Sequence, residues 1–524
     1  MWSVIGNILL FILVLSVVIC VHELGHFYFA KRAGILCHEF AFGMGPRLFS
    51  KKIGETTFSI RAFPFGGFVS MSGEELSSDI VKKGDKIRLM FDDDMNVVKM
   101  ILNPKNPKYA DLTEIDVEEI DLKGVGMTPL YINGYPVNRN AFYVFDSHEI
   151  QIAPYERSFV SKTKGQRFMV TFAGAMMNII LAFFVYLLIA FAYGVPDAAS
   201  TVVSTVSDTM PATGIVLPGD QIIAVNGVLV SAWEDDDPAI ATVSSELAKY
   251  QTAGTFILTV LRDGETVILD PIAPQYYFYG LGFASTPDST ELVIAAPLYT
   301  DTELMAGDVI VSIDGTTFAD WNEVIAFAVA YTAGSTEEEP TTIIVDRLNA
   351  ETAVVERLTF TYVAYGSDVL AAMGYESLYS RLGISGSTHF AFFPSFGIAL
   401  QDLGDAAISI YRTLWLLLTS KQVKVSQLSG FIGIYSITAN AAAAGMRSLL
   451  NWVGLLSVNL GIVNLLPIPA LDGGRLAFIA YEAITKKKPN QKVENWMHTI
   501  VLFLLLGLLV FITYNDILRL IFNR

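Results

Sequence analysis

Four long uncharged segments interrupt a chain in which polar and apolar residues otherwise mix or alternate. They cover residues 2–21, 168–194, 448–471 and 499–515. Each is long enough to cross a bilayer as a helix, since a span needs roughly 17–25 predominantly apolar residues. A fifth uncharged run, residues 426–446, is poor in Leu and Phe, and we expect it to be packed or partly inserted. The pattern predicts a polytopic α-helical membrane protein with four spans.

Basic residues beside the spans predict the orientation. One group follows the first span, a second precedes the second span and a third follows the third span: Lys31 to Lys52, Lys162 to Arg167 and Lys486 to Lys488. The positive-inside rule places all three groups in the cytoplasm. We therefore expect a multi-pass protein of the cell membrane whose two termini, and residues 195–447, lie outside.

Alternation and turn signals predict β structure between and after the spans. Residues 57–69 are strand-like and aromatic, and Gly66-Gly67 indicates the turn of a cytoplasmic hairpin. This hairpin either packs on its own domain or dips into the membrane, where an exposed edge would pair with an extended substrate. Residues 87–102 read as strand, turn and strand within a small cytoplasmic β insert.

The region outside the membrane contains an internal repeat. Residues 213–227 are echoed by residues 305–315, and a tryptophan, Trp233 or Trp321, follows each copy. The pattern resembles bacterial PDZ domains. In the permuted bacterial form, the strand near residue 282 would belong to the preceding repeat and would move the boundary. PDZ grooves bind peptides by strand addition. Alternatively, the two domains are steric shields without a ligand.

These patterns predict nine segments in order. They are a first transmembrane helix (1–30), a loop with a membrane-associated hairpin (31–76), a β insert (77–157), a second transmembrane helix (167–194), two PDZ-like domains (198–282 and 283–385), an amphipathic and partly inserted linker (396–446), a third transmembrane helix (448–485) and a fourth (495–518).

Composition agrees with this architecture and excludes one class of partner. The 524 residues are 52% hydrophobic and only 17% charged, as expected for several spans with soluble parts. The formal net charge of −17 argues against nucleic acid as a partner. The two cysteines, Cys20 and Cys37, are too few for a disulfide framework and lack metal-binding spacing, so we expect neither to bind a metal.

Candidate chemistry lies at the end of the first uncharged segment. His22 and His26 are four residues apart, which places both imidazoles on one helix face where they can share a metal ion. Glu23 is beside the first histidine and suits a general base that activates water. Such polar groups are costly at the end of a span unless they have partners or a function. The alternative is a polar helix end in the headgroup region.

A second group of polar residues ends the third uncharged segment at the same predicted side. Pro467 and Pro469 must break this helix, and Asp472 follows them. Two histidines and one carboxylate make a catalytic zinc set with an open fourth position. The alternative is that Asp472 only caps the next helix. In the second span, Asn178 follows small residues that permit close helix packing, and an interhelical hydrogen bond is its favoured role.

These motifs together resemble the site-2 protease family. The matching features are His22-Glu23-Leu24-Gly25-His26, the run from Asn464 through Pro467 to Leu471-Asp472-Gly473, and the PDZ-like repeats between them. The chain is most similar to bacterial regulated intramembrane zinc proteases that act on anti-sigma factors. The insert 77–157 is similar to Gram-positive members, whereas Ala175 stands where the family commonly has proline.

The resemblance implies specific roles. His22, His26 and Asp472 would bind Zn²⁺, and Glu23 would activate water. The implied substrate-binding residues are Asn464, Asn178 and the hairpin residues Phe65, Gly66 and Gly67. The substrates would be single-span membrane proteins, such as anti-sigma factors or signal-peptide remnants, already cut once by another protease. A membrane scaffold with a degenerate zinc site and a zinc transporter are the rival interpretations.

Overall fold

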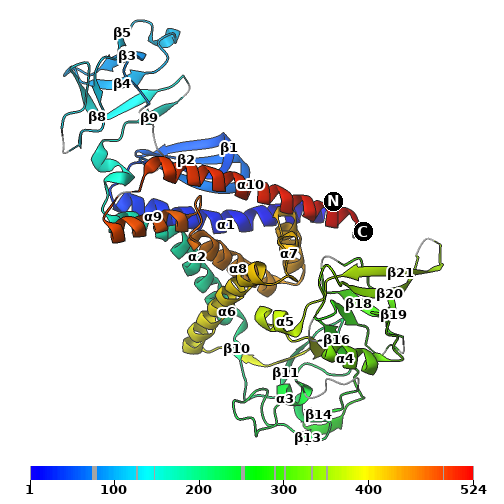
Figure 1. Ribbon diagram of the computed structural model, residues 1–524. Coiled ribbons are helices and arrows are strands. Elements are labelled where there is room, and N and C mark those ends of the chain that lie inside the picture. Colours follow the sequence, from blue (N-terminus) through cyan, green and yellow to red (C-terminus); the bar gives the residue numbers. More distant parts are fainter. Residues whose placement is uncertain are drawn as a thin grey trace. The chain divides into compact units, whose positions relative to one another are not determined.

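The computed structural model describes residues 2–73, 80–125, 128–146, 148–248, 254–287, 289, 291–299, 302–331, 334–349, 352–487 and 489–522. The chain forms two compact units (Figure 1). The first contains residues 1–184, 438–444 and 451–506, and the second contains residues 185–437, 445–450 and 507–524. The chain passes between them more than once because several helices are shared.

The described residues contain helices of very different lengths. They are α1 (Trp2–Arg32), α2 (Lys164–Tyr193), α3 (Val243–Ala248), α4 (Trp321–Ala330), α5 (Ser367–Met373), α6 (Phe392–Thr419), α7 (Phe431–Ala443), α8 (Met446–Leu465), α9 (Asp472–Thr485) and α10 (Gln491–Phe522). Among them, four are long and apolar enough to cross a membrane: α1, α2, α8 and α10. Within the run 426–446, the apolar helix α7 is too short to cross a membrane, so the described structure has no fifth candidate span there.

The predicted third span is not one helix. It separates into α8 and α9, and the loop between them carries Pro467 and Pro469. Proline removes a backbone donor and its ring clashes with the preceding turn, so a helix cannot continue through this pair. The break places Asp472 at the first residue of a new helix.

The hairpin that follows α1 is longer than the sequence pattern indicates. Strands β1 (Cys37–Ile53) and β2 (Thr56–Met71) lie along α1 (Figure 1), and the turn between them is at Gly54, where φ is +63°. Gly66 and Gly67 therefore lie inside β2, which corrects the predicted turn. Both strands bend, so residues 37–42 pair with 67–71 and also with 57–60. The two glycines accommodate this bend, because Gly66 has a φ of +79°.

The insert is a small β module with its own core. Its strands are β3 (Lys86–Phe91), β4 (Val97–Ile101), β5 (Thr113–Asp116), β6 (Ile120–Asp121), β7 (Tyr131–Ile132), β8 (Tyr135–Val144) and β9 (Glu149–Gln151). They form one sheet in the order β5-β3-β4-β8-β7-β6, and β9 pairs with β8. Fully buried residues such as Ile87, Leu89 and Met100 form the core.

The second unit contains most of the remaining strands. They are β10 (Val195–Pro196), β11 (Val203–Val206), β12 (Gln221–Val225), β13 (Val228–Leu229), β14 (Leu258–Arg262), β15 (Glu265–Ile268), β16 (Gln275–Phe278), β17 (Phe283–Ser285), β18 (Ile294–Pro297), β19 (Val309–Ile313), β20 (Thr341–Leu348), β21 (Val355–Tyr362), β22 (Leu378–Arg381), β23 (Ile384–Gly386) and β24 (Thr388–His389). They surround two separate hydrophobic cores.

The two repeated segments make the same buried ion pair. Asp220 is hydrogen-bonded to Arg262 by two contacts of 2.7 Å, and Asp308 is bonded to Arg347 by contacts of 2.7 and 2.8 Å. Each aspartate also accepts a backbone N–H three residues earlier in the chain, at 2.8 Å. Burial alone would raise the pKa of Asp220, but the Arg262 guanidinium lowers it below its usual range. The turn in each repeated segment is therefore stabilised by the same aspartate–arginine ion pair.

The two cores do not divide at residue 282. Residues 275–282, which we expected to close the first domain, contribute Phe278 and Leu281 to the second core. Conversely, Leu382 packs in the first core, and the strand β23 pairs with β11. The second core is thus formed by a segment nested within the chain of the first. Strand pairing over about 180 residues decides this arrangement, and a local sequence pattern does not contain that information.

Candidate metal centre

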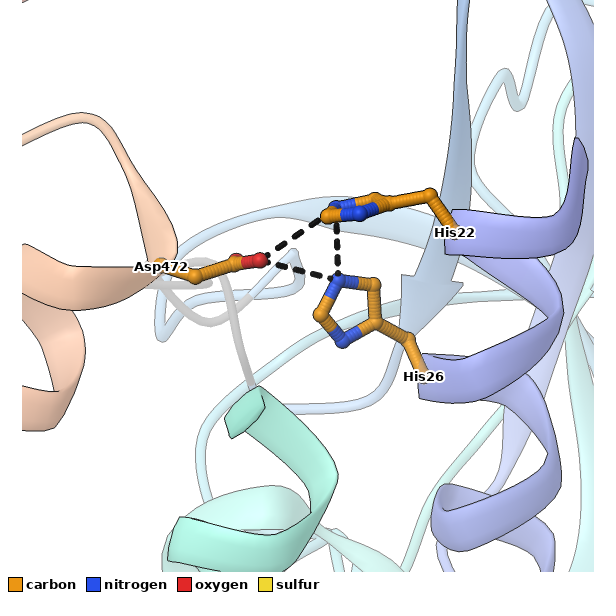
Figure 2. Close-up of side chains that lie close together, drawn as sticks. All are labelled: His22, His26 and Asp472. Atoms are coloured by element: carbon orange, nitrogen blue, oxygen red, sulfur yellow. Dashed lines mark hydrogen bonds and ion pairs between the residues drawn. The ribbon is translucent and has the colours of Figure 1, made fainter. Parts of the chain in front are cut away.

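The metal centre begins on one face of α1. His22 and His26 are both buried, and their rings meet edge to face with centroids 4.9 Å apart. The two Nε2 atoms are 3.2 Å apart. Asp472, at the start of α9, presents Oδ2 to both, at 3.3 Å from His22 Nε2 and 3.2 Å from His26 Nε2 (Figure 2). The structure therefore brings together the three residues that the sequence predicts as ligands, from positions 450 residues apart in the case of His22 and Asp472.

The three ligand atoms have the spacing that zinc requires. Zinc bonds of about 2.0–2.1 Å in tetrahedral geometry place neighbouring ligand atoms about 3.3–3.4 Å apart. The observed separations of 3.2, 3.2 and 3.3 Å agree with that value. Asp472 Oδ2 is also buried without a hydrogen bond from a described residue. Burial of a charged oxygen without a hydrogen bond is costly unless a cation binds it, so the three residues fit a zinc ion.

Backbone and side-chain groups of α2 orient both histidines. His26 Nδ1 donates to the carbonyl of Val170 at 2.8 Å, and in the neutral ring this tautomer leaves Nε2 available to a metal. Asn178 is fully buried, and its amide lies 3.4 Å from His22 Nδ1. Among the described residues, its Oδ1 has no hydrogen-bond partner. If the amide is turned, Oδ1 accepts the Nδ1–H that a His22 bound through Nε2 must carry.

Small residues allow α2 to approach the site closely. A methyl group on Gly174 would lie 2.3 Å from His26 Nε2 and 2.8 Å from His22 Cε1. Any larger residue would therefore occupy the space of the metal or its ligands. The sequence indicated close packing from the small residues around position 174 but did not indicate that the partner is the metal centre. The Ser457 hydroxyl donates to the Asn178 carbonyl at 2.7 Å. No sequence pattern indicated this contact or the role of the Val170 carbonyl.

Glu23 lies against β2. Its side chain is half-buried, and a methyl group on Gly67 would be 3.1 Å from Glu23 Cγ. Gly67 thus permits the β2 backbone to pass directly beside the predicted general base. Residues 67–71 pair with 37–42 on one side, and no strand among the described residues pairs with their other side.

The other predicted substrate-binding residues are placed differently. Asn464 lies in the last turn of α8, half-buried, and among the described residues no hydrogen bond joins it to the three ligands. Gly66 is in β2 near Met44, 3.1 Å from where its Cβ would be. Phe65 is also in β2, but its side chain is outside the described part of the structure. The described residues of the metal cluster include neither cysteine.

Comparisons with known proteins show the family of the chain. The model of "Peptidase family M50" matches residues 10–508. The chain is 31% identical over 521 residues to the zinc metalloprotease RasP of Shouchella clausii, covering 98% of this chain and 99% of the relative. It is also 31% identical over 523 residues to the "Regulator of sigma-W protease RasP" of Bacillus subtilis, with the same coverage. A putative zinc metalloprotease of Staphylococcus aureus is 28% identical over 528 residues.

Proposed function

From the premise that this chain belongs to peptidase family M50 and is a zinc-dependent metalloprotease of the membrane, we propose that it cuts the transmembrane segments of single-span membrane proteins. The premise confirms the predicted resemblance to site-2 proteases and the predicted zinc cofactor. It also removes the scaffold and transporter interpretations. The type of substrate and the role of each residue are the parts that we propose.

One observation carries the proposal. His22 and His26 lie on α1, which is a candidate membrane span, and Asp472 begins α9, directly after the break that follows the candidate span α8. The contacts among these three side chains therefore join two candidate spans at one site. A soluble protease does not need to hold its metal between candidate membrane spans. Broken backbone at membrane depth is tolerated where it is buried or lines a polar cavity, as expected for an active site that receives a peptide.

We assign each residue of the centre a role. His22, His26 and Asp472 hold the zinc ion, which when bound polarises the scissile carbonyl and lowers the pKa of water. Glu23 takes the proton of the attacking water and passes it to the leaving amine. The Val170 carbonyl and Asn178 keep the two imidazoles in the tautomer that binds through Nε2. With three protein ligands, the bound ion would remain accessible to water and substrate.

The substrate must become extended before it is cut. A helix shields its own carbonyls and satisfies them internally, so it is resistant in a bilayer. The side of residues 67–71 that no described strand pairs with offers hydrogen bonds to an extended strand beside Glu23. Gly66, Gly67 and Phe65 would line this strand, and Asn464 would bind the substrate backbone. These contacts would replace the bonds that the substrate helix loses.

The repeats are assigned to the selection of substrates. By the positive-inside rule, the two termini and the PDZ-like domains lie outside, and the zinc centre lies near the cytoplasmic face. Domains on the opposite side from the zinc would exclude proteins with bulky ectodomains, so that a first cut by another protease is needed. Anti-sigma factors fit this description, and the name of the Bacillus subtilis relative, a regulator of sigma-W protease, supports that class.

The test is cleavage of a single-span substrate in liposomes by the wild type and by Glu23→Gln, with zinc content measured on both. We expect one zinc per chain in both proteins and a loss of cleavage of about 10²- to 10⁴-fold in the variant, the usual contribution of a general base. Glu118→Gln, at an exposed carboxylate of the insert, is the matched control and should cleave normally.

Two outcomes would contradict the proposal. Cleavage by Glu23→Gln within tenfold of the wild type would remove the role of Glu23. Cleavage of soluble peptides without cleavage of the membrane-embedded segment, when the ectodomain has been trimmed, would remove the proposed substrate class.

A further inference from the structure

The loop between α8 and α9 bonds most of its amides within itself. The N–H groups of Leu466, Ile468 and Leu471 donate to carbonyls two or three residues earlier in the chain, at 3.1, 2.6 and 3.1 Å. Ala470 is different, because its N–H donates to the Nδ1 atom of His498 in α10 at 2.8 Å. Ala470 is two residues before Asp472, so a helix remote in sequence holds the backbone that leads into a metal ligand.

Ala470 needs such support. Its φ is +78°, in the left-handed region that a residue with a Cβ rarely adopts. Residues in this region persist only when their surroundings enforce them, and they cluster at functional sites. The turn directs the chain from the prolines into α9. If the backbone at Ala470 left this conformation, the start of α9 would shift and Asp472 would move with it.

His498 contacts both sides of the turn. Its ring lies against Phe478 of α9, with centroids 5.9 Å apart, while its Nδ1 bonds to the loop before α9. Because Nδ1 accepts, the ring proton is on Nε2. The histidine therefore connects the loop, the helix that Asp472 begins, and α10. It makes no contact with His22 or His26 among the described residues.

We propose that His498 is a positioning residue that holds Asp472 at the distance zinc binding needs. It acts through the Ala470 amide and touches neither the metal ligands nor the substrate. The inference rests on the proposed metal centre. It predicts that loss of the Nδ1 acceptor weakens zinc binding even when the ring volume is kept.

The experiment measures the zinc affinity of the full-length protein in detergent by competition with a chromophoric chelator. Asparagine places an acceptor oxygen near the position of Nδ1, whereas glutamine places it near Nε2, and phenylalanine keeps the contact with Phe478 without any acceptor. We expect His498→Gln and His498→Phe to weaken zinc binding about 10- to 100-fold, as outer partners of metal sites do. His498→Asn should remain within about threefold of the wild type.

Two further readouts separate the outcomes. Hydrogen exchange of the peptide containing Ala470 should be faster in His498→Phe and unchanged in His498→Asn, because only the former lacks the bond. Equal zinc affinity in all three variants, or an equal loss in all three, would overturn the inference. Asp472→Asn tests the centre itself: if that variant keeps zinc, the metal site is wrong, whereas zinc loss in Asp472→Asn with normal binding in His498→Phe refutes only the role of His498.

Discussion

His22 and His26 come from an unbroken helix of 31 residues, whereas Asp472 follows a loop with two prolines and a left-handed alanine. The helical spacing of four residues by itself places the two imidazoles on one face. Nothing local places Asp472. Its position depends on contacts of the loop and of α9 with other helices, such as the bond from Ala470 to His498. One half of the proposed metal centre is thus set by local helix geometry, and the other half is assembled by the tertiary fold.

A further contact holds the assembled half. Glu482 of α9 is buried and paired with Arg167 of α2 at 2.7 Å, and Lys164 donates to the Glu482 carbonyl at 2.9 Å. This ion pair fixes α9 to the start of the helix that also carries Gly174 and Asn178. The comparison predicts that substitutions of residues that do not touch Asp472 can still displace it. The positions of the two histidines should change mainly when groups in contact with the imidazoles are substituted.

Removal of a ligand from either half should have the largest effect. We expect His26→Asn and Asp472→Asn each to lose zinc and to lower cleavage by about 10³-fold or more, since the ion supplies several kcal/mol of transition-state stabilisation. The measurement is zinc per chain with cleavage of a liposome substrate, and unchanged circular dichroism is the control for folding. Stoichiometric zinc in either variant would show that the residue is not a ligand.

Loss of the Asn178 amide tests the half set by helix geometry. Asn178→Leu keeps the volume but removes the partner of His22 Nδ1, so the ring is no longer held in the tautomer that binds zinc. We expect zinc affinity to fall about 10- to 100-fold by chelator competition. The matched control is Ser457→Ala, which removes a bond to the Asn178 backbone only and should change affinity little. If both variants behave alike, helix packing and not the amide accounts for the effect.

Loss of the Arg167–Glu482 pair tests the assembled half and should affect zinc least. Glu482→Gln leaves Arg167 without its charged partner, and breaking a buried pair costs about 3–5 kcal/mol of stability. We expect a lower thermal unfolding midpoint with a decrease in zinc affinity below about tenfold, because the pair is remote from Asp472 along α9. The double variant Arg167→Met, Glu482→Leu should recover part of the stability. An unchanged midpoint in Glu482→Gln would show that this pair does not hold α9.

The hairpin shows where sequence patterns become insufficient. Alternation correctly indicated strands after α1, but Gly66-Gly67 belongs to a bend inside β2 and the turn is at Gly54. Two adjacent glycines are compatible with a hairpin turn or with a bend inside a strand, because both structures need the same backbone freedom. The choice depends on pairing with residues 37–42, which lie at the other end of the hairpin. The nesting of the second repeat's strands within the first could not be predicted from sequence patterns for the same reason.

The sequence by itself determined the elements whose information is local. Uncharged runs predicted the four candidate spans, the spacing of His22 and His26 predicted a shared metal, and the prolines predicted the break before Asp472. Only the tertiary structure decided which groups support them: the Val170 carbonyl and Asn178 behind the histidines, Gly174 beside them, and His498 behind the loop. A ligand is recognised by its chemistry in a short motif. A supporting group is recognised only by where the folded chain places it, because almost any residue that can offer an acceptor, or leave a space, can serve.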